Sequence, residues 1–438
     1  MLDIRFIREN KKAVKKAIED KNVDLDLDKL LDLDKKRVRA LQKIEKLQKE
    51  RNQLNDRIAK AENKEEIIAE GSKIKEQLAE LDPEYKKIKD EFDELMVRVP
   101  TIPSKDTPKG KSDADNVEID KWGEKTEFKF KAKDHIELGK DLDILDLEKG
   151  SKVGGYRGYY LKNEGVSLVM GLMMYAINKM IKKGFAPMIP PTLVKEFALF
   201  GSGYFKGKKY DGETDEIYQV ATSDKEADGS ESKEKKFLVG TAEPSLLAYY
   251  SDELLDEKDL PIRTCGYSQC YRSEIGSYGK DTKGMYRVHE FMKVEQIIVS
   301  KADIGEADAL QKEMVGITRE MHEELGLPYR VLQICTGDMG VGKYKMFDIE
   351  AWMPGLDRWG ETGSASNFLD WQSRRLNVKY VDKEGKKKYA YLLNNTALPS
   401  PRIFIAILEN YQQADGSVVI PEVLRKWMPG NIERIERK

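Results

Sequence analysis

Charged and aromatic side chains recur at two-residue intervals in one segment past the middle of the chain, TCGYSQCYRSEIGSYGKDTKGMYRVHEFMKVEQIIV, which predicts two strands joined by a long polar loop. Arg272 and Glu274 would share one face of the first strand, because side chains alternate along a strand. Phe291, Lys293 and Glu295 would share one face of the second strand for the same reason. Such charges are costly to bury unless they pair or meet a ligand, so this hairpin is a candidate pocket; the alternative is a solvated hairpin face.

Composition limits the possible function classes. The length of 438 residues predicts two or three domains. The chain has 76 Lys and Arg against 78 Asp and Glu, which leaves a formal charge of −2. Any RNA contact therefore requires a local basic patch. Three cysteines, Cys265, Cys270 and Cys335, are too few for a disulfide framework and favour a reducing compartment. The first residues, MLDIRFIREN, are charged and show no apolar h-region, so we expect no export. The most apolar run, residues 165–181, is too mixed to span a bilayer. We therefore expect a soluble, cytoplasmic protein without a membrane partner.

A thin apolar stripe at three- and four-residue steps extends over residues 28–99, with an interruption at residues 62–72. This pattern predicts two long helices folded back as an antiparallel coiled coil. Residues 35–60 hold ten Lys and Arg against three Asp and Glu, whereas residues 62–94 hold six against twelve. The first helix is either a basic surface for phosphate groups or simply the electrostatic partner of the second, and the sequence leaves both interpretations open.

The order of the remaining patterns predicts the domain organisation. Residues 1–100 would form the helical arm, and residues 101–123, rich in Pro, Lys, Asp, Ser and Gly, would be a linker. Residues 124–438 would form an α+β domain with a mainly antiparallel sheet flanked by helices, because strand-like runs follow one another directly. The charged insert at residues 223–236 predicts a mobile surface loop. Helices are expected near residues 166–183, 303–325 and 402–413.

One helix start has a local rationale of its own. Ser400 is a suitable N-cap and Pro401 suits the first helical position. Arg402 would then project from a helix N-terminus, whose partial positive charge favours phosphate.

Several segments resemble the class II aminoacyl-tRNA synthetases. YRSEIGSYGKDTKGMYRVHEFMKVE resembles motif 2 of that class, GFAPMIPPTLV resembles motif 1, and ALPSPRIFIAILENYQ stands where motif 3 belongs. The segments GTAE, TGDMG, ETGSASNFLDWQSRR and ENYQQADGSVVIPEVL are similar to the seryl-tRNA synthetase family in particular. The likeness covers nearly the whole chain, including the arm. It implies an ATP-dependent serine–tRNA ligase that forms seryl-adenylate, works as a homodimer with motif 1 at the interface, and has a class II catalytic domain.

The resemblance implies how ATP is bound. Arg272 would contact the α-phosphate and the amino acid carboxylate, and Arg402 the γ-phosphate, both as catalytic residues, since arginine forks match phosphate oxygens. Glu274 would accept from the adenine amino group, and Phe291 would stack on the ring. The full implied ATP set is Arg272, Ser273, Glu274, Val288, His289, Glu290, Phe291, Glu361, Thr362, Gly363, Ser364 and Arg402.

The resemblance also implies a metal site and a serine site. Glu361 and Ser364 would hold Mg²⁺, a hard cation that oxygen ligands suit. A site built to bond the serine hydroxyl strongly disfavours alanine. Taken singly, the two threonines of the serine site could be ordinary sheet-edge polarity. The implied serine set is Thr241, Ala242, Glu243, Arg272, Glu295 and Thr396.

The same resemblance implies a partner for the helical arm of the protein: it would bind the long variable arm of tRNA(Ser) through phosphate contacts. The resemblance leaves open whether tRNA(Sec) is a further substrate. Two rival interpretations remain. The enzymatic rival is a ligase that loads an amino acid on a carrier protein, which would resemble the catalytic domain but lack the arm, or a ligase that activates a different small amino acid. An RNA-binding scaffold with an inactive catalytic domain would not need Arg272, Glu274, Glu361 and Arg402.

Four positions depart from the family pattern. Pro401 stands where many class II enzymes have glycine, and Thr362 and Gly363 replace bulkier or hydroxylated residues between the motif's glutamate and serine. Lys343 stands where small residues are usual. None of these departures removes an implied phosphate or serine contact.

Overall fold

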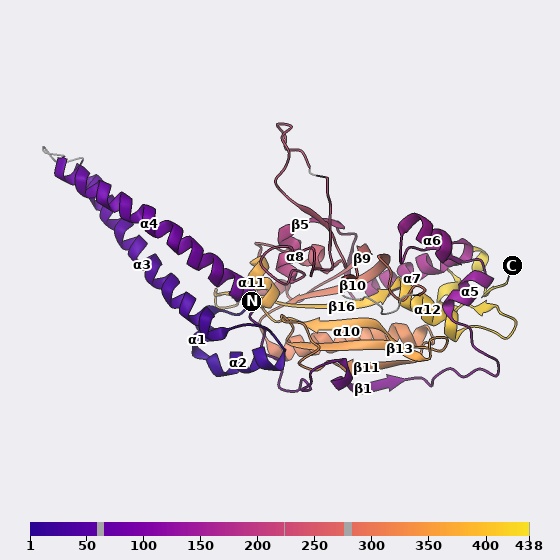
Figure 1. Ribbon diagram of the computed structural model, residues 1–438. Coiled ribbons are helices and arrows are strands. Elements are labelled where there is room, and N and C mark those ends of the chain that lie inside the picture. Colours follow the sequence, from indigo (N-terminus) through magenta and orange to yellow (C-terminus); the bar gives the residue numbers. More distant parts are fainter. Residues whose placement is uncertain (59–64, 223, 276–282, 438) are drawn as a thin grey trace. The chain divides into compact units, whose positions relative to one another are not determined.

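The computed structural model describes residues 1–437 except 59–64, 223 and 276–282. The chain forms two compact units, Met1–Pro100 and Thr101–Lys438 (Figure 1). Within the described residues, no helix is both long enough and apolar enough to cross a bilayer.

The first unit is built from helices. Two short helices precede two long antiparallel ones, and the long pair packs along a seam of buried apolar side chains that includes Ile44, Leu54, Ile74 and Leu78. The predicted coiled coil is therefore confirmed. Of the expected interruption at residues 62–72, residues 65–72 are helical, because the second long helix begins at Glu65 and continues through Gly71 and Pro83. Residues 59–64 lie outside the described residues. The helices are α1 Ile4–Glu9, α2 Lys11–Asp20, α3 Leu27–Ile58 and α4 Glu65–Met96.

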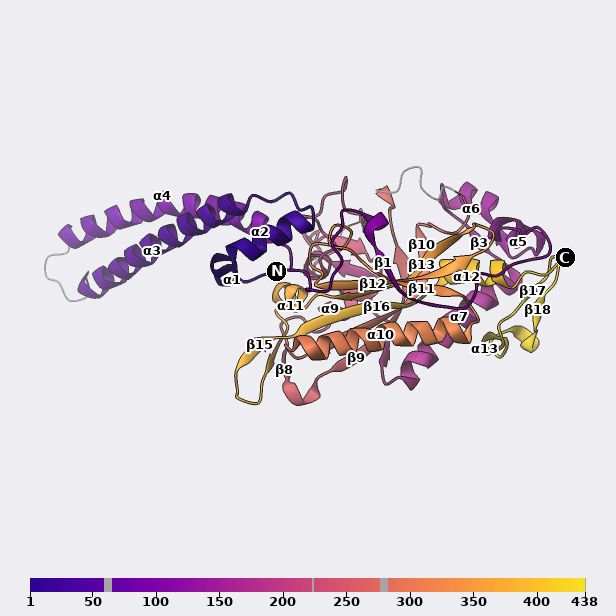
Figure 2. The same cartoon turned by 90° about the horizontal axis from the view of Figure 1, so that it is seen from below.

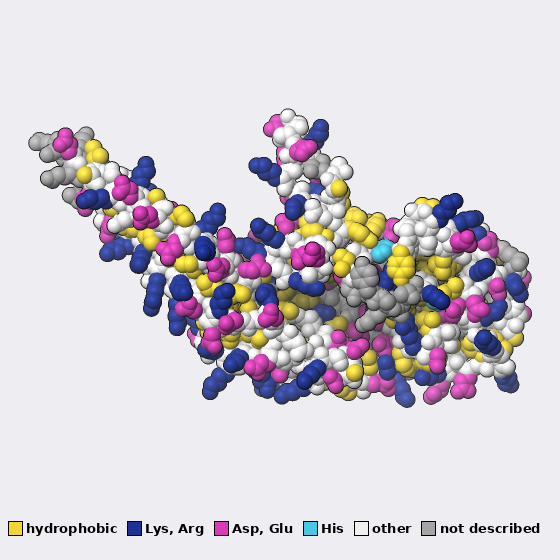
Figure 3. All heavy atoms as spheres, in the orientation of Figure 1, with side chains coloured by type: hydrophobic (Ala, Val, Ile, Leu, Met, Phe, Trp, Pro, Cys, Tyr) yellow, Lys and Arg dark blue, Asp and Glu magenta, His cyan; other side chains and the backbone are white. Residues whose placement is uncertain are grey.

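Basic side chains of α3 lie at the surface of the arm (Figure 3). Ion pairs such as Lys36–Asp32 at 2.8 Å and Lys89–Asp93 at 2.6 Å join neighbours on the same helix. Each of these two pairs lies within a single helix.

The second unit is organised around an eight-stranded sheet in the order β1-β11-β12-β13-β16-β10-β9-β4, antiparallel except where β4 pairs with β9. The predicted fold class is confirmed. Its strands are β1 Val117–Trp122, β4 Ala186–Met188, β9 Ile262–Tyr271, β10 Glu290–Ser300, β11 Tyr329–Gln333, β12 Lys345–Met353, β13 Arg358–Asn367 and β16 Tyr391–Pro399. Smaller sheets contain β5 Leu193–Lys195, β6 Tyr218–Gln219 and β7 Lys236–Leu238; β8 Leu254–Asp256, β14 Lys379–Val381 and β15 Lys387–Tyr389; β2 Leu145–Asp146 and β3 Tyr160–Leu161; β17 Val418–Val419 and β18 Arg434–Ile435.

Helices pack against this sheet, and the three helices expected from the sequence are all present. Their counterparts are α7 Asn163–Lys182, α10 Ile304–Glu324 and α12 Ser400–Asn410. The others are α5 His135–Asp141, α6 Leu147–Gly154, α8 Glu196–Ser202, α9 Glu243–Ala248, α11 Trp371–Leu376 and α13 Glu422–Arg425.

The helix α10 covers one face of the sheet (Figure 2). On that face Gln296 of β10 and Asn395 of β16 each donate a hydrogen bond to the Thr318 hydroxyl of α10, at 3.2 and 3.0 Å. Because strand side chains alternate, residues one step away on these strands point to the opposite face. That opposite face carries the polar side chains of the candidate site.

The interval 101–123, expected as a linker, is part of the second unit. Its end forms β1, which pairs with β11 at the edge of the large sheet. The Thr101 amide donates to Val341 O at 3.0 Å. The buried Lys345 ammonium forms ion pairs with Asp106 at 2.9 Å and with Asp308 of α10 at 3.0 Å. A composition typical of linkers therefore covers a segment that is fixed to the sheet by hydrogen bonds and a buried cation.

The charged insert, expected as a mobile loop, forms a hairpin extension between β6 and β7 in its described residues (Figure 1). Lys225 and Glu231 form a β-bridge, and the Ser232 amide donates to Asp224 O at 2.8 Å. A polar composition does not prevent the two sides of the insert from pairing, because backbone hydrogen bonds need no apolar side chains. Residue 223 lies outside the described residues.

We predict that Lys345→Met lowers the free energy of unfolding by about 1–2 kcal/mol, because removing one partner leaves Asp308 partly buried without its cation. Urea-induced unfolding measures this loss. Asp106→Asn is the matched control, since Asp106 is 64% exposed and its loss should cost less than about 0.5 kcal/mol. Equal effects of the two variants would contradict the account.

Candidate active site

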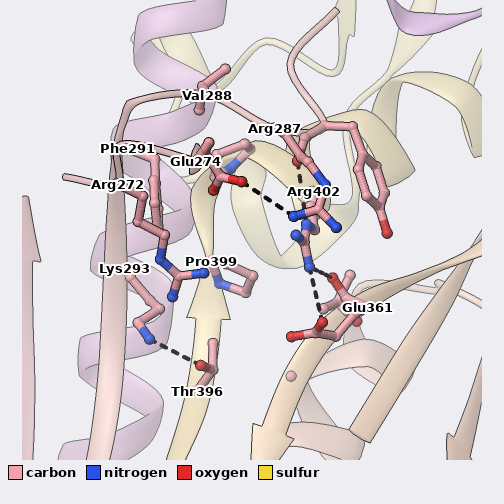
Figure 4. A pocket seen from close by; sticks show the side chains of 14 residues that line it. Arg272, Glu274, Arg287, Val288, Phe291, Lys293, Glu361, Thr396, Pro399 and Arg402 are labelled. Carbon is pink, nitrogen blue, oxygen red and sulfur yellow. Dashed lines mark hydrogen bonds and ion pairs between the residues drawn. The ribbon is translucent and has the colours of Figure 1, made fainter. Parts of the chain in front are cut away.

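The predicted hairpin of β9 and β10 is present, and its second strand carries the expected residues. Phe291, Lys293 and Glu295 alternate along β10, opposite Cys270, Ser268 and Gly266 of β9. Phe291 and Lys293 line a pocket on the sheet face that α10 does not cover (Figure 4). The pocket is lined by Arg272, Glu274, Tyr286, Arg287, Val288, Phe291, Lys293, Glu361, Thr362, Gly363, Thr396, Pro399, Pro401 and Arg402.

Arg272 and Glu274 do not share a strand face, because β9 ends at Tyr271. Arg272 starts the loop, where its amide donates to His289 O at 2.9 Å and its Nε donates to Gly240 O at 3.2 Å. Its guanidinium group lies 5.4 Å from the centre of the Phe291 ring. The loop carries Arg272 into the pocket, so the expectation of a shared site is met by a different geometry.

Glu274 adopts a left-handed backbone conformation, with φ of 54°, and its side chain is 7% exposed. Arg287 Nη1 lies 3.3 Å and Arg157 Nη1 lies 3.4 Å from its Oε2 atom. These two guanidinium groups fix the carboxylate at the pocket wall. No pattern in the sequence points to Arg157, which comes from a loop more than a hundred residues earlier in the chain.

Arg402 and Glu361 meet on the other side of the pocket. Arg402 Nη1 donates to Glu361 O at 2.9 Å and lies 3.4 Å from Glu361 Oε2 (Figure 4). Desolvation would raise the pKa of the Glu361 carboxyl, but the guanidinium groups of Arg402 and Arg272 outweigh it and hold that pKa below its usual value. Glu361 is therefore an anion that faces two arginines.

The start of α12 differs from the expectation by one position. The N-cap is Pro399, and Ser400 is already helical. The Ser400 hydroxyl instead accepts a hydrogen bond from the Met292 amide of β10 at 3.1 Å. This contact ties the helix start to β10, and Arg402 still lies in the first turn and lines the pocket.

Asp348 of β12 is a site residue that the sequence reasoning missed. It lies directly opposite Ser364 of β13, and its buried Oδ1 atom has no hydrogen-bond partner among the described residues. Burial, and then the charge of Glu361, raise the pKa of this carboxyl well above its usual value. The alternation of polar Asp348 with apolar Phe347 and Ile349 was the available signal.

Asp348, Glu361 and Ser364 together suit a hard cation. Two carboxylates and a hydroxyl are oxygen donors of the kind that Mg²⁺ prefers, and Mg²⁺ normally completes its coordination with water and substrate phosphates. The unpartnered Asp348 oxygen supports this fit. In the part of the chain that the structure describes, no group of three or more His, Cys, Asp or Glu side chains forms a metal cluster.

Glu243, at the start of α9, is buried, and its side chain accepts three hydrogen bonds. Its Oε1 accepts from Gln372 Nε2 and Asn394 Nδ2, each at 2.7 Å, and its Oε2 accepts from the Tyr204 hydroxyl at 2.8 Å. Burial and the neighbouring Glu295 raise the pKa of Glu243 to about 7. These three donors come from distant segments and were not found from the sequence.

The other predicted serine ligands surround Glu295. Its Oε2 atom lies 2.6 Å from Lys293 Nζ and accepts from Thr241 Oγ1 at 3.3 Å. Thr396 Oγ1 accepts from Lys293 Nζ at 3.1 Å and lies 3.4 Å from the same Glu295 oxygen. The fully buried Ala242 is the N-cap of α9 and contributes no polar side chain. The structure thus brings both carboxylates of the predicted serine set to one end of the pocket region.

The remaining predicted ATP residues flank the lining. Val288 belongs to it, whereas Ser273 and His289 adjoin Arg272 through the chain and through the loop hydrogen bonds. Glu290 accepts from Gln269 Nε2 at 2.8 Å at the start of β10.

Two family models match the chain. "Seryl-tRNA synthetase N-terminal domain" matches residues 1–103, and "tRNA synthetase class II core domain (G, H, P, S and T)" matches residues 218–411. A serine–tRNA ligase from Treponema denticola is 41% identical over 429 residues, which cover 97% of this chain and 98% of the relative. The chain belongs to the seryl-tRNA synthetase family.

Solved structures agree with this assignment to the seryl-tRNA synthetase family. The enzyme from Pyrococcus horikoshii, crystallised with ATP, is 37% identical with a TM-score of 0.87, and the match covers 100% of both chains. A cytoplasmic serine–tRNA ligase from Naegleria fowleri in complex with AMP is 29% identical with a TM-score of 0.83, covering 100% of this chain and 99% of the other.

We predict that Glu243→Gln changes how stability depends on pH. The raised pKa means that the wild type loses stability as pH rises from about 4.5 to about 7, because over this range the carboxyl ionises in the unfolded chain but stays protonated in the folded protein. Above pH 7 both states ionise and the loss is complete. The glutamine cannot ionise, and its amide oxygen can accept from Gln372 and Asn394. Relative to the wild type, the variant should gain about 3 kcal/mol between pH 4.5 and pH 8. Unfolding curves over that range test this, and a pH-independent difference would contradict it.

Proposed function

We propose that the chain is a serine–tRNA ligase that activates L-serine with ATP to seryl-adenylate and transfers serine to the 3′ end of tRNA(Ser). In the first step a serine carboxylate oxygen bonds to the α-phosphorus and pyrophosphate leaves. In the second step the terminal hydroxyl of the tRNA attacks the adenylate carbonyl and AMP leaves. Both steps need positioned cations more than a general base, and the pocket provides arginines.

Arg272 and Arg402 are the proposed catalytic residues. Arg272 projects from the base of the loop and would contact the α-phosphate and the serine carboxylate. Arg402 projects from the other wall and would contact the γ-phosphate, so the triphosphate would lie between the two guanidinium groups. Glu274 and Phe291 would hold the adenine, by a hydrogen bond and by stacking respectively.

Mg²⁺ is the proposed cofactor, held by Glu361 and Ser364 with Asp348 as a third oxygen donor. Bound there, it would neutralise charge on the ATP phosphates. Serine would lie beside this position, with its ammonium group near Glu243 and Glu295 and its hydroxyl near Thr396. Thr241 and Ala242 complete the proposed serine set, and Ser273, Val288, His289, Glu290, Thr362 and Gly363 complete the ATP set. Thr362 would take part through its backbone, because its hydroxyl group lies 2.8 Å from His322 Nε2.

The arm is the proposed tRNA contact. The exposed basic side chains of α3 suit phosphate groups of the variable arm, which position the tRNA without reading its sequence. Whether tRNA(Sec) is a second substrate depends on the same surface, since that tRNA would have to offer a comparable arm.

A homodimer is the proposed assembly. Apolar side chains of α7 stand exposed at helical spacing: Val166 is 45%, Met170 43% and Met174 40% exposed. Ile189, in the motif 1 segment, is 83% exposed. An apolar surface of this kind supports an interface along motif 1. A cytoplasmic location agrees with the three free cysteines.

The observation that carries the proposal is the convergence of Arg272, Arg402 and Glu361 on one pocket beside the buried carboxylates Glu243 and Glu295. ATP–pyrophosphate exchange with serine, threonine, alanine and glycine tests it. We expect serine to exceed alanine by roughly 10⁴-fold, because alanine leaves the hydroxyl partners unpaired. Arg272→Lys should lower serine-dependent exchange by about 10²-fold. Faster exchange with another amino acid would indicate a ligase with a different substrate. A wild-type exchange rate in Arg272→Lys would refute the assigned site.

Deletion of residues 28–99 separates the two units. We expect the deleted protein to retain serine-dependent pyrophosphate exchange and to lose charging of tRNA(Ser) by at least about 10²-fold, because phosphate contacts supply most of the affinity. The matched measurement uses wild-type enzyme with tRNA(Ser) that lacks its variable arm, which should show a similar loss. Equal loss of exchange and charging would mean that the arm is not a separate tRNA-binding unit.

A further inference from the structure

Glu361 and Ser364 should not face the same way on a regular strand. They are separated by three positions on β13, and side chains of a strand alternate, so an odd separation places them on opposite faces. A metal site that uses both residues therefore requires an irregularity between them.

The structure has this irregularity at Thr362. In the pairing of β12 with β13, Glu350 lies opposite Glu361 and Ile349 lies opposite Gly363, so Thr362 has no partner and forms a β-bulge. The extra residue resets the alternation. Glu361 and Ser364 then lie opposite Glu350 and Asp348, which are two residues apart and share the pocket face.

The side chain of Thr362 is directed to the other face, toward α10. Its Oγ1 atom lies 2.8 Å from Nε2 of His322 and 3.2 Å from Ile349 O. His322 is fully buried, and its Nδ1 lies 2.8 Å from Thr318 O, which can only accept a hydrogen bond. Burial lowers the pKa of His322 to about 4, so the imidazole is neutral and Nδ1 carries its proton. The single hydroxyl proton of Thr362 then has two acceptors, Nε2 at 2.8 Å and Ile349 O at 3.2 Å, of which Nε2 is the nearer.

Gly363 is explained by the same geometry. A Cβ atom there would lie 3.0 Å from Ile349 Cδ1 and 3.3 Å from Thr318 Cγ2. Residues 362 and 363 thus both face α10 at the bulge, and there is room for the side chain of only one of them. The two departures from the family pattern at these positions form one arrangement with His322.

We propose that Thr362 and His322 are positioning residues that hold the bulge and thereby keep Glu361 and Ser364 on the same face for a divalent cation bound with ATP. The hydrogen bond anchors the bulged residue to α10, so the strand cannot relax to a regular register that would turn one ligand away. This inference rests on the proposed metal role of Glu361 and Ser364.

The test measures the Kd for Mn²⁺ of the enzyme in the presence of ATP and in the absence of serine. The electron paramagnetic resonance signal of free Mn²⁺ reports how much of the ion is unbound. Thr362→Val keeps the shape of the side chain but removes the hydroxyl. We expect the Kd for Mn²⁺ to rise about tenfold, as for loss of other groups that orient metal ligands. Thr362→Ser keeps the hydroxyl and should stay within about twofold of the wild type.

Two reference variants separate the possible failures. Thr264→Val removes an equally buried hydroxyl from β9, away from the bulge, and should leave the Kd unchanged. Glu361→Gln should weaken Mn²⁺ binding; if it does not, the proposed metal role of Glu361 is wrong. If Glu361→Gln weakens binding and Thr362→Val does not, the positioning role is wrong.

A double variant, Thr362→Val with His322→Leu, distinguishes positioning from core packing and serves if Thr362→Val alone fails to fold. Replacing both polar partners by apolar groups should restore part of the stability, because the buried Nε2 acceptor of His322 is removed together with its donor. The proposal expects the raised Kd for Mn²⁺ to persist in this variant. Recovery of the wild-type Kd together with stability would mean that the pair only fills the core.

Discussion

Each buried carboxylate of the pocket has to be matched by hydrogen-bond donors or by a cation, because an unmatched buried charge is too costly. Three donors converge on the buried Glu243, and Lys293 pairs with the buried Glu295. Glu361, whose side chain is 47% exposed, pairs with Arg402. Asp348 is the exception, since burial and the charge of Glu361 raise its pKa well above the usual value. Ionisation of Asp348 therefore requires an added positive charge, which a bound cation would supply.

This balance depends on elements far apart in the sequence. Lys293 and Glu295 come from one strand, but Arg402 comes from a helix start and Gln372 from another helix. The antiparallel sheet is what brings them together, because its central strands β10, β16, β13 and β12 place successive site residues side by side on one face. The helix α10 covers the other face of these strands, and the pocket lies on the face that it leaves uncovered.

Strand periodicity and helix signals predicted the sheet class, the coiled coil, α7, α10 and α12, and the alternation of Phe291, Lys293 and Glu295. They failed where the backbone leaves a regular period: β9 ends before Arg272, and a bulge resets the alternation after Glu361. Composition also misled at residues 101–123, where a polar segment is held by backbone hydrogen bonds and by Lys345. Partners such as Arg157 could not be found, because only tertiary structure brings them to Glu274.

The departure at Lys343 fits the same electrostatic requirement. Its ammonium group lies 3.1 Å from the sulfur of Met346 and is close enough to favour the ionised forms of Glu243 and Glu361. A lysine at this position thus adds positive charge to a sheet face with an excess of carboxylates.

The most direct measurement is a crystal structure of the protein with a non-hydrolysable seryl-adenylate analogue. The account predicts that the phosphate surrogate contacts Arg272, the adenine lies against Phe291, and the serine amine lies near Glu243 and Glu295. An analogue bound outside this pocket, or bound with its serine end away from these carboxylates, would contradict the account.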